Sequence, residues 1–332
     1  MKLLRKILFP VVPIYFFVTW LRNKLYDWDI KKSTSFSLPV ICVGNLSVGG
    51  TGKTPMIEYL IRLLKDDNKI AILSRGYKRK TEGFQLADVN ASAKSIGDEP
   101  FQFYSKFKND VLVAVDSDRR NGIKKLNEKQ PHIILLDDAF QHRKVKAGLN
   151  ILLTTYDNPY FKDMVLPTGN LREPQEGAKR ADIIVVTKCP KTINVIEKAG
   201  IIKQIAAKPH QQVFFSSIAY SDTLFSAVKT KSLESLKHFT LVTGIANAKP
   251  LVNFLNEKQL SFNHLNFKDH YDFTKEDVAA LEKEDLIVTT EKDFMRLKQH
   301  DALSEKLFYL PITVNIDNPE KLNKIITDFV KH

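Results

Sequence analysis

The segment at residues 47–54, SVGGTGKT, constrains the fold of this chain more than any other stretch. A short apolar run at residues 39–44 precedes it and indicates a buried parallel strand. Apolar residues at helical spacing follow it over residues 55–64. A strand, a glycine-rich turn, Lys-Thr and a helix are the context of a phosphate-binding loop, so this segment predicts a nucleotide-binding α/β fold.

The residue types in this loop suit the binding of phosphates. Its three glycines let the backbone curl so that N–H groups point at an anion, and the following helix adds the positive end of its dipole. Lys53 is expected to reach the β- and γ-phosphates, and the Thr54 hydroxyl to hold Mg²⁺. The generic pattern has glycine where this chain has Ser47, so an ordinary glycine-rich turn is the alternative interpretation. The flanking strand and helix favour the phosphate site.

A repeating order of strand, loop and helix extends from residue 39 to residue 187. This order predicts a parallel sheet covered by helices on both faces, with ligands bound at the carboxyl ends of its strands. Polar residues directly after the strands are therefore the candidates for the site. The apolar runs that indicate strands are at residues 39–44, 70–73, 111–115, 133–136, 151–153 and 183–186.

Two pairs of carboxylates stand out in this part of the chain. Asp137 and Asp138 follow four apolar residues, which is the Walker B arrangement that holds Mg²⁺ directly or through water. Asp98 and Glu99 precede an aromatic helix, and here the pattern leaves two interpretations open. Either the pair belongs to the site, or Asp98 caps the helix with Pro100 near its first turn.

Cations for phosphate occur in two further places. Arg119 follows the strand at residues 111–115 and is either a phosphate ligand or part of a solvated surface pair. Arg172 lies in a long, turn-rich connection at residues 166–174, where it is placed to clamp a phosphate with two hydrogen bonds. The sequence TKCP at residues 187–190 stands where GTPases read guanine. Pro190 replaces the required Asp, so guanine selection is not supported.

A second set of strands and helices follows residue 200. It predicts a smaller α/β domain at residues 211–332, after a nucleotide-binding domain at residues 29–210. Pro311 interrupts the last strand and makes it an edge strand at best. His270 lies in a loop, and chemistry alone assigns it no role. The expected strands are residues 213–215, 239–242, 262–267, 286–288 and 307–314, and the expected helices are residues 249–255, 274–281 and 291–297.

Residues 1–28 differ from the rest of the chain. Cationic residues flank an apolar, aromatic run at residues 7–21, which is too short to span a bilayer and is interrupted by Pro10 and Pro13. No small-residue cleavage site of a signal peptide follows it. A first helix buried in the protein's own core is the alternative, but aromatics between cations favour a helix at the membrane interface.

The formal net charge of +12 and the pI near 9.4 suggest an anionic partner, but for scattered lysines a lysine-rich solvated surface is the favoured explanation. The two cysteines, Cys42 and Cys189, have no paired spacing and predict neither a disulfide framework nor a zinc site. A reducing cytosolic compartment fits this cysteine usage.

Taken together, these segments resemble the tetraacyldisaccharide 4′-kinase family of Gram-negative bacteria. The resemblance implies transfer of the ATP γ-phosphate to the 4′-hydroxyl of a tetraacylated glucosamine disaccharide 1-phosphate, giving lipid IVA in lipid A biosynthesis. It implies an active site between two α/β domains, with the smaller domain closing over it. The matching segments run in family order at residues 44–55, 74–77, 97–100, 137–142, 166–169, 171–174 and 269–271.

The resemblance also implies roles residue by residue. It implies a catalytic pair of Asp98 and His270, assisted by Lys53. Family members often have a second histidine where this chain has Tyr271, so Tyr271 is given no role. The implied metal-site residues are Thr54, Glu99, Asp137 and Asp138. The implied ATP-binding residues are Ser47, Val48, Gly49, Gly50, Thr51, Gly52, Lys53, Thr54, Arg119, His142 and Arg172.

The cofactors expected from this resemblance are ATP and Mg²⁺. The expected partners are the acylated disaccharide and an anionic membrane surface, with no nucleic acid, and the chain is expected to be a monomer at the cytoplasmic face of the bacterial inner membrane. The alternative is a membrane-associated ATPase of the partitioning type, which carries an extra loop lysine where this chain has Val48. A nucleic-acid-dependent ATPase is suggested by charge alone and has no supporting motif.

Overall fold

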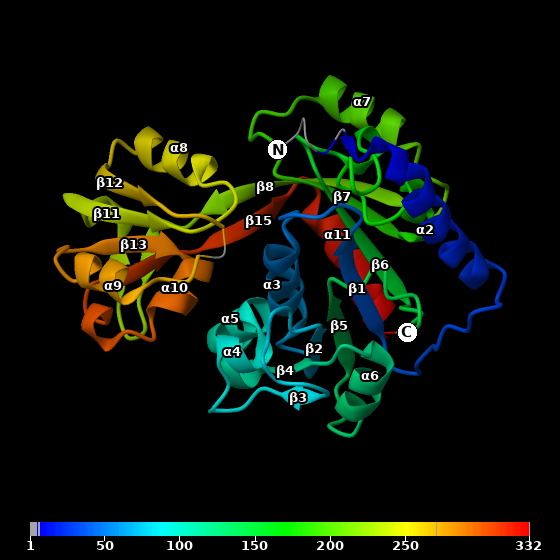
Figure 1. Ribbon diagram of the computed structural model, residues 1–332, viewed down its shortest axis with the longest axis horizontal. Coiled ribbons are helices and arrows are strands. Elements are labelled where there is room, and N and C mark those ends of the chain that lie inside the picture. The colour runs from blue at the N-terminus through cyan, green and yellow to red at the C-terminus, as the bar shows by residue number, and fades with distance from the viewer. Residues whose placement is uncertain (1–4, 6, 270, 332) are drawn as a thin grey trace.

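The computed structural model describes residue 5, residues 7–269 and residues 271–331. The chain forms two β-sheets that lie side by side (Figure 1). The larger has nine strands in the order β15-β8-β7-β6-β1-β5-β2-β4-β3. The smaller has six strands in the order β10-β9-β14-β13-β11-β12. The α/β class and the parallel-sheet domain predicted from the sequence are confirmed.

The larger sheet is parallel except at its two edges, where β3 and β15 run antiparallel to their neighbours. Its strands are β1 Val40–Asn45, β2 Ile70–Ser74, β3 Gln85–Leu86, β4 Val111–Val115, β5 Ile133–Asp137, β6 Leu149–Thr155, β7 Ile183–Thr187, β8 Gln212–Tyr220 and β15 Ile312–Ile316. Its associated helices are α2 Val12–Asp27, α3 Lys53–Leu64, α4 Ala93–Ile96, α5 Asp98–Phe107, α6 Arg119–Asn127, α7 Val195–Ile205 and α11 Pro319–Lys331.

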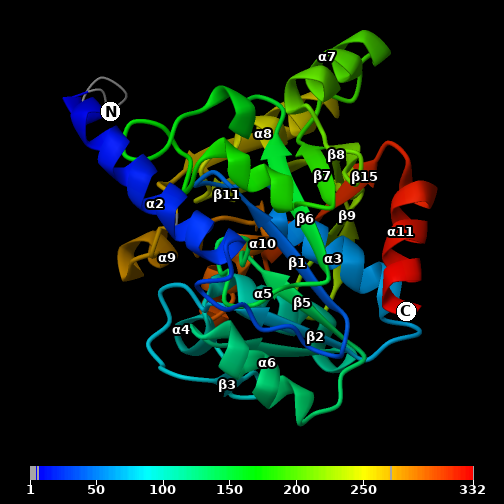
Figure 2. The ribbon, with the colours of Figure 1, turned by 90° about the vertical axis from the view of Figure 1, so that its right-hand side faces the viewer.

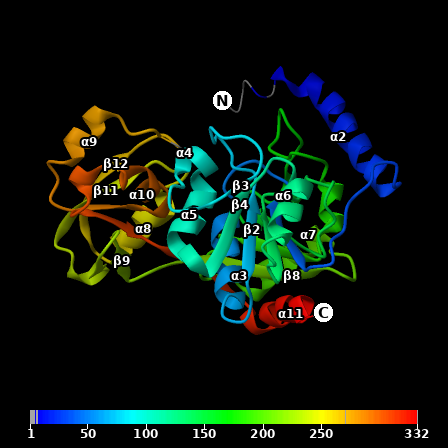
Figure 3. The ribbon, with the colours of Figure 1, turned by 90° about the horizontal axis from the view of Figure 1, so that it is seen from below.

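Helices cover both faces of this sheet, which explains why its strands are continuous apolar runs. One core packs α3, α5 and α11 on the sheet through residues such as Ile57, Phe103 and Ile326. The other core, on the opposite face, includes Ile123 of α6 and Val12 of α2. Figures 2 and 3 show α11 and α2 on opposite sides of the sheet. Cys42 and Cys189 are buried and free, as their spacing indicates.

The smaller sheet packs α8 Lys249–Glu257 against one hydrophobic core and α9 Lys275–Leu281 and α10 Glu291–Leu297 against another. Its strands are β9 Thr223–Phe225, β10 Thr230–Ser232, β11 His238–Thr243, β12 Ser261–Asn266, β13 Ile287–Thr290 and β14 Leu307–Leu310. The bounds of α10 agree with the prediction. The expected capping box of Thr274 and Asp277 opens α9.

Two strand assignments from the sequence are corrected by the pairing. The strand expected at residues 213–215 pairs with β7, so β8 belongs to the larger sheet. Residues 307–314 are two strands: β14 lies between β13 and β9, whereas β15 pairs with β8. Pro311 lies between β14 and β15, where the chain passes from the smaller sheet to the larger one. Proline has no backbone N–H, so it cannot continue the hydrogen-bond ladder of a strand. The larger sheet thus takes strands from both sides of residue 210, and the division there stays a prediction.

The N-terminal helix α2 lies along the outside of the larger unit (Figure 1). Its outward side chains are apolar and exposed; Ile14 is 66%, Phe17 56% and Val18 59% accessible. Its inward side packs Val12 and Tyr15 against the core. In the described part of the chain, no helix is both long and apolar enough to cross a membrane.

Candidate active site

The phosphate-binding loop joins β1 to α3 at the carboxyl end of the sheet. Gly49 and Gly52 have φ values of 107° and 89°, a region that favours glycine, and Gly52 is the N-cap of α3. Lys53 and Thr54 therefore open the helix, where its dipole attracts anions. Ser47 bridges to Leu171, and the Val48 N–H donates to the Asn170 carbonyl at 2.8 Å, so the loop is held against the 166–174 connection.

Two residues at the end of β7 hold the other side of this loop. The Thr187 hydroxyl donates to the Thr51 carbonyl at 2.8 Å, and Lys188 Nζ donates to the Gly50 carbonyl at 2.6 Å. Carbonyls that are held outward leave the loop N–H groups able to turn inward. The side chain of Thr51 is buried, and its hydroxyl has no partner among the described residues.

Lys53 lies between β1 and the residue after β5. Its ammonium is 3.4 Å from Asn45 Oδ1 and 3.7 Å from Asp138 Oδ1. Arg172 Nη1 donates to the same Asp138 oxygen at 2.8 Å. Burial by itself would raise the pKa of Asp138, but Lys53 and Arg172 outweigh it and hold that pKa below its ordinary value.

Asp137 ends β5 and is buried. Its Oδ2 accepts a hydrogen bond from the Ser74 hydroxyl at 3.0 Å. Burial, followed by the neighbouring Asp138 carboxylate, raises the pKa of Asp137 to about 6, and Glu99 acts in the same direction. Lys53 opposes this rise. These residues form a carboxylate pair whose negative charges are only partly neutralised by the described residues.

Arg119 contacts the backbone of this pair, and His142 lies near Arg119. Arg119 is buried at the start of α6, and its guanidinium donates to the carbonyls of Asp116 at 3.0 Å and Asp137 at 3.4 Å. Arg119 is therefore not the solvated surface cation of the alternative interpretation. Burial, with Arg119 as the next cause, lowers the pKa of His142 to about 4 and keeps the imidazole neutral near pH 7. His142 Nε2 is buried without a partner among the described residues.

Asp98 and Glu99 stand at the start of α5 and face α10 of the smaller unit. Gly97 is the N-cap of α5, so Asp98 does not cap this helix. Asp98 Oδ2 accepts from Arg296 Nη2 at 2.7 Å, and Glu99 Oε1 accepts from Lys292 Nζ at 2.9 Å. Burial opposes ionisation of Glu99, but Lys292 prevails and the pKa of Glu99 is lowered.

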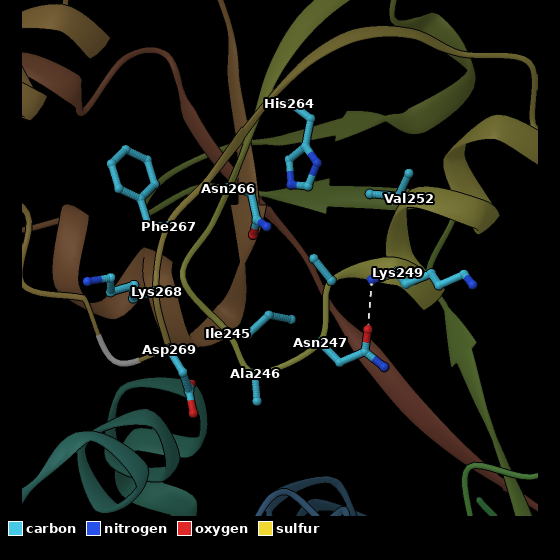
Figure 4. Close-up of a pocket in the computed structure, with 11 residues that line it drawn as sticks. Ile245, Ala246, Asn247, Lys249, Val252, His264, Asn266, Phe267, Lys268 and Asp269 are labelled. Carbon is cyan, nitrogen blue, oxygen red and sulfur yellow. Dashed lines mark hydrogen bonds between the residues drawn. The ribbon is translucent and has the colours of Figure 1, made fainter. Parts of the chain in front are cut away.

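The predicted catalytic His270 lies outside the residues that the structure describes. Its neighbour Asp269 borders a 520 Å³ pocket at the carboxyl ends of β11 and β12. Figure 4 shows His264 and Asn266 of β12 on one side of this pocket, and Asn247 and Lys249 at the start of α8 on the other. Asp269, the residue before His270, thus lies at the carboxyl end of the smaller sheet.

The described residues contain no cluster of three or more His, Cys, Asp or Glu side chains able to hold a metal by themselves. Mg²⁺ in phosphoryl-transfer sites is commonly held by one or two carboxylates together with substrate phosphates and water. Asp137 and Asp138 fit that pattern, because Asp138 lies next to Lys53 of the loop and the raised pKa of Asp137 marks a place where added positive charge favours its ionised form.

Sequence reasoning missed several polar residues of this region. Asn45, Ser74 and Lys188 each end or directly follow a strand, and the rule that ligands gather at strand ends would have found them. Lys292 and Arg296 carried no such signal. They lie on a helix of the smaller unit and meet Asp98 and Glu99 only through packing of α10 on α5.

Comparison with known proteins agrees with this arrangement. A tetraacyldisaccharide 4′-kinase of Flavobacterium johnsoniae is 50% identical over 343 residues, which cover 100% of this chain and 98% of the relative. One of Phocaeicola vulgatus is 46% identical, covering 99% of this chain and 96% of the relative. A crystal structure of LpxK from Aquifex aeolicus in complex with ATP has a TM-score of 0.80 and 32% identity, covering 98% of this chain and 99% of that one.

The family model described as tetraacyldisaccharide-1-P 4′-kinase, LpxK, matches residues 4–331. This match includes both sheets and every residue of the site described above. The chain belongs to the tetraacyldisaccharide-1-P 4′-kinase family.

Proposed function

We infer that this chain is an ATP-dependent tetraacyldisaccharide 4′-kinase of lipid A biosynthesis. The observation that carries this inference is the meeting of Lys53, at the start of α3, with Asp138, after β5, at the carboxyl end of the sheet. A phosphate-binding loop opposite a Walker B carboxylate is the arrangement that phosphoryl transfer requires. The match to an ATP complex of LpxK supports ATP as the donor.

We propose that the phosphates of ATP lie on the loop at residues 47–54, with Lys53 at the β- and γ-phosphates. Arg119, His142 and Arg172 complete the electrostatic environment, Arg172 through its contact with Asp138. Mg²⁺ would be held by Thr54, Asp137 and Asp138 with support from Glu99. When bound, the ion neutralises charge that develops on the phosphate oxygens.

The acceptor is the 4′-hydroxyl of a tetraacylated glucosamine disaccharide 1-phosphate, and the product is lipid IVA. The bond from the 4′-oxygen to the γ-phosphorus forms while the bond from that phosphorus to the β–γ bridging oxygen breaks, and ADP leaves. The proton of the hydroxyl passes to Asp98, which His270 orients. Because His270 belongs to the smaller unit, we propose that this unit closes over the site during the reaction.

We propose that α2 seats the enzyme on an anionic membrane, where the acyl chains of the acceptor remain. The apolar outer side chains of α2 are exposed, while its inner side is fixed to the site. The Tyr15 hydroxyl donates to the Arg172 carbonyl at 3.0 Å, and Arg22 donates to the Gln141 carbonyl at 2.9 Å. We further propose a monomer at the cytoplasmic face of the bacterial inner membrane, where ATP is available.

The decisive experiment is incubation of the chain with ATP, Mg²⁺ and the disaccharide 1-phosphate in vesicles, with the mass of the lipid product as the readout. A gain of one phosphoryl group is expected, together with loss of product when EDTA removes the metal. Parallel reactions with vesicles alone and with DNA measure ATP hydrolysis. Faster hydrolysis with vesicles but no phosphorylated lipid would identify a membrane-stimulated ATPase, and stimulation by DNA alone would overturn the kinase.

A further inference from the structure

We propose that Arg296 is a positioning residue for phosphoryl transfer, and that it holds the Asp98 carboxylate from the opposite unit. The inference rests on the proposed function, since it requires Asp98 to take part in the reaction. Arg296 belongs to α10 beneath the smaller sheet, and Asp98 opens α5 on the larger sheet. The two residues are 198 positions apart in the chain.

The guanidinium of Arg296 bridges two carboxylates. Its Nη2 donates to Asp98 Oδ2 at 2.7 Å, and its Nη1 donates to Asp293 Oδ1 at 3.1 Å. The Arg296 side chain is 9% accessible and that of Asp293 is 0%, whereas the Asp98 side chain retains 28%. The cation is thus enclosed on the side of the smaller unit, while the carboxylate that it holds is still reached by solvent.

Asp293 gives Arg296 a rigid support. Asp293 Oδ2 accepts from the Gly244 N–H at 2.8 Å and from the Thr290 hydroxyl at 2.7 Å. A Cβ at Gly244 would lie 3.0 Å from Asp293 Oδ1, so glycine permits this close approach. Arg296 therefore cannot rotate without breaking contacts that are fixed to the end of β11 and the start of α10. A planar guanidinium held in this way fixes both the position and the direction of the carboxylate that it contacts.

Lys298, a second cation at this interface, differs from Arg296 in what it touches. Lys298 also faces α5, but it donates to the Ser105 hydroxyl at 3.0 Å and lies over the Phe101 ring at 4.4 Å. Lys298 thus has the packing role of an interface cation without contact to a carboxylate proposed for the reaction. It supplies a matched control on nearly the same stretch of chain.

The position of Asp98 is expected to affect the rate of phosphoryl transfer more than it affects the binding of substrates. A hydroxyl must lie in line with the γ-phosphorus and within hydrogen-bond reach of the group that accepts its proton. Small displacements of such a group lower the rate strongly, because the reactive geometry is then populated less often. ATP is bound by the other unit, so its KM is expected to change little when Arg296 is replaced.

The test compares the full chain with Arg296→Met, Arg296→Lys and Lys298→Met in the lipid phosphorylation assay. We expect Arg296→Met to lower kcat about 10- to 100-fold with the KM for ATP within about threefold of wild type. Arg296→Lys, which keeps the charge, should recover part of that loss, and Lys298→Met should match wild type. In an Asp98→Asn background, Arg296→Met should cost less than about threefold, because the two residues act as a unit.

A kcat for Arg296→Met within about threefold of wild type would overturn this inference and leave the proposed function standing. An equal loss of kcat from Arg296→Met in the wild-type and Asp98→Asn backgrounds would do the same. If Arg296→Met fails to fold because the buried Asp293 carboxylate has lost its cation, Asp293→Asn removes that charge. The double variant Arg296→Met/Asp293→Asn is then compared with the single variant Asp293→Asn. Equal kcat values in that comparison would also overturn it. A wild-type chain that forms no phosphorylated lipid would overturn the proposed function and, with it, this inference.

Discussion

The ammonium group of Lys53 lies 3.7 Å from Oδ1 of Asp138, the oxygen that also accepts from Arg172 at 2.8 Å. A single carboxylate thus connects the start of α3, the end of β5 and the connection at residues 166–174. Two cations around one carboxylate keep Asp138 ionised, while the buried Asp137 beside it has a raised pKa. In the function proposed above, these cations would receive the phosphates and these carboxylates would hold Mg²⁺.

Lys53→Ala should reduce phosphorylated lipid to background and leave the fold intact. The side chain adds little to stability because its polar contacts among the described residues, with Asn45 at 3.4 Å and Asp138 at 3.7 Å, are long, whereas the phosphates would lose their principal cation. Product mass and thermal melting measure the two effects. Lys65→Ala, which removes a lysine paired with Asp110 at the other end of α3, serves as the control. Normal turnover by a folded Lys53→Ala chain would remove the loop from the mechanism.

Replacement of Phe17 and Val18 by Asp should release the chain from anionic vesicles and weaken activity on the acylated acceptor. Both side chains are exposed on α2, and charges there oppose insertion among lipid chains. Vesicle sedimentation is the measurement, and added salt should weaken the binding of the wild-type chain. The same change at Val195 and Ile196, an exposed apolar pair on α7, is the control. Deletion of residues 1–28 with unchanged sedimentation would contradict the interfacial role of this segment.

Asp98→Asn and His270→Ala should each lower turnover by about 10²–10⁴, the usual effect of losing a general base or its partner. Residues that act as a unit are far from additive, so the second substitution should cost little once the first is made. Turnover of both single variants and the double variant measures this coupling. Since Gly97 caps α5, the melting temperature of Asp98→Asn is not expected to show the loss of a helix cap. Fully additive losses would show that the two side chains work independently.

The stability of the unliganded chain should fall as the pH rises from about 5 to about 8, and Glu291→Gln should reduce this fall. Glu291 is buried at the start of α10, where it shares the Lys106 ammonium with Glu58. Burial, with the Glu58 carboxylate as the next cause, raises the pKa of Glu291 from 4.5 to about 7. A raised folded-state pKa means that the folded chain binds the extra proton, so the stabilisation is present at low pH and is lost as the pH passes through 7.

Thermal melting across this pH range measures the effect. Asp137, whose pKa is also raised, contributes with the same sign, whereas His142, whose pKa is lowered from 6.5 to about 4, contributes with the opposite sign below about pH 6.5. Glu291→Gln should therefore change only its own part of the slope. The exposed Glu276 of α9 gives a control substitution, Glu276→Gln, that should leave the slope unchanged. An identical slope for wild type and Glu291→Gln would show that Glu291 is ionised throughout.

The sequence by itself determined the glycine-rich loop, the parallel strands β1, β2, β4, β5, β6 and β7 of the larger sheet, and the position of Asp137 and Asp138 at the end of one of them. Each of these is written in a window of about ten residues: continuous apolar runs for buried strands, glycines for the loop, and Asp at a strand end. It also fixed the bounds of α10 and the capping box of α9, because helical periodicity and caps act between residues three or four apart.

Only the tertiary structure decided which sheet each strand joins and what Asp98 contacts. The chain enters the smaller sheet after β8 and leaves it at Pro311, and local pattern does not distinguish this path from a second domain with its own complete set of strands. The contact of Asp98 with Arg296 spans 198 positions. Side chains so far apart meet because α10 packs on α5, and that packing depends on the burial of apolar surface across the whole molecule, which no short window of sequence encodes.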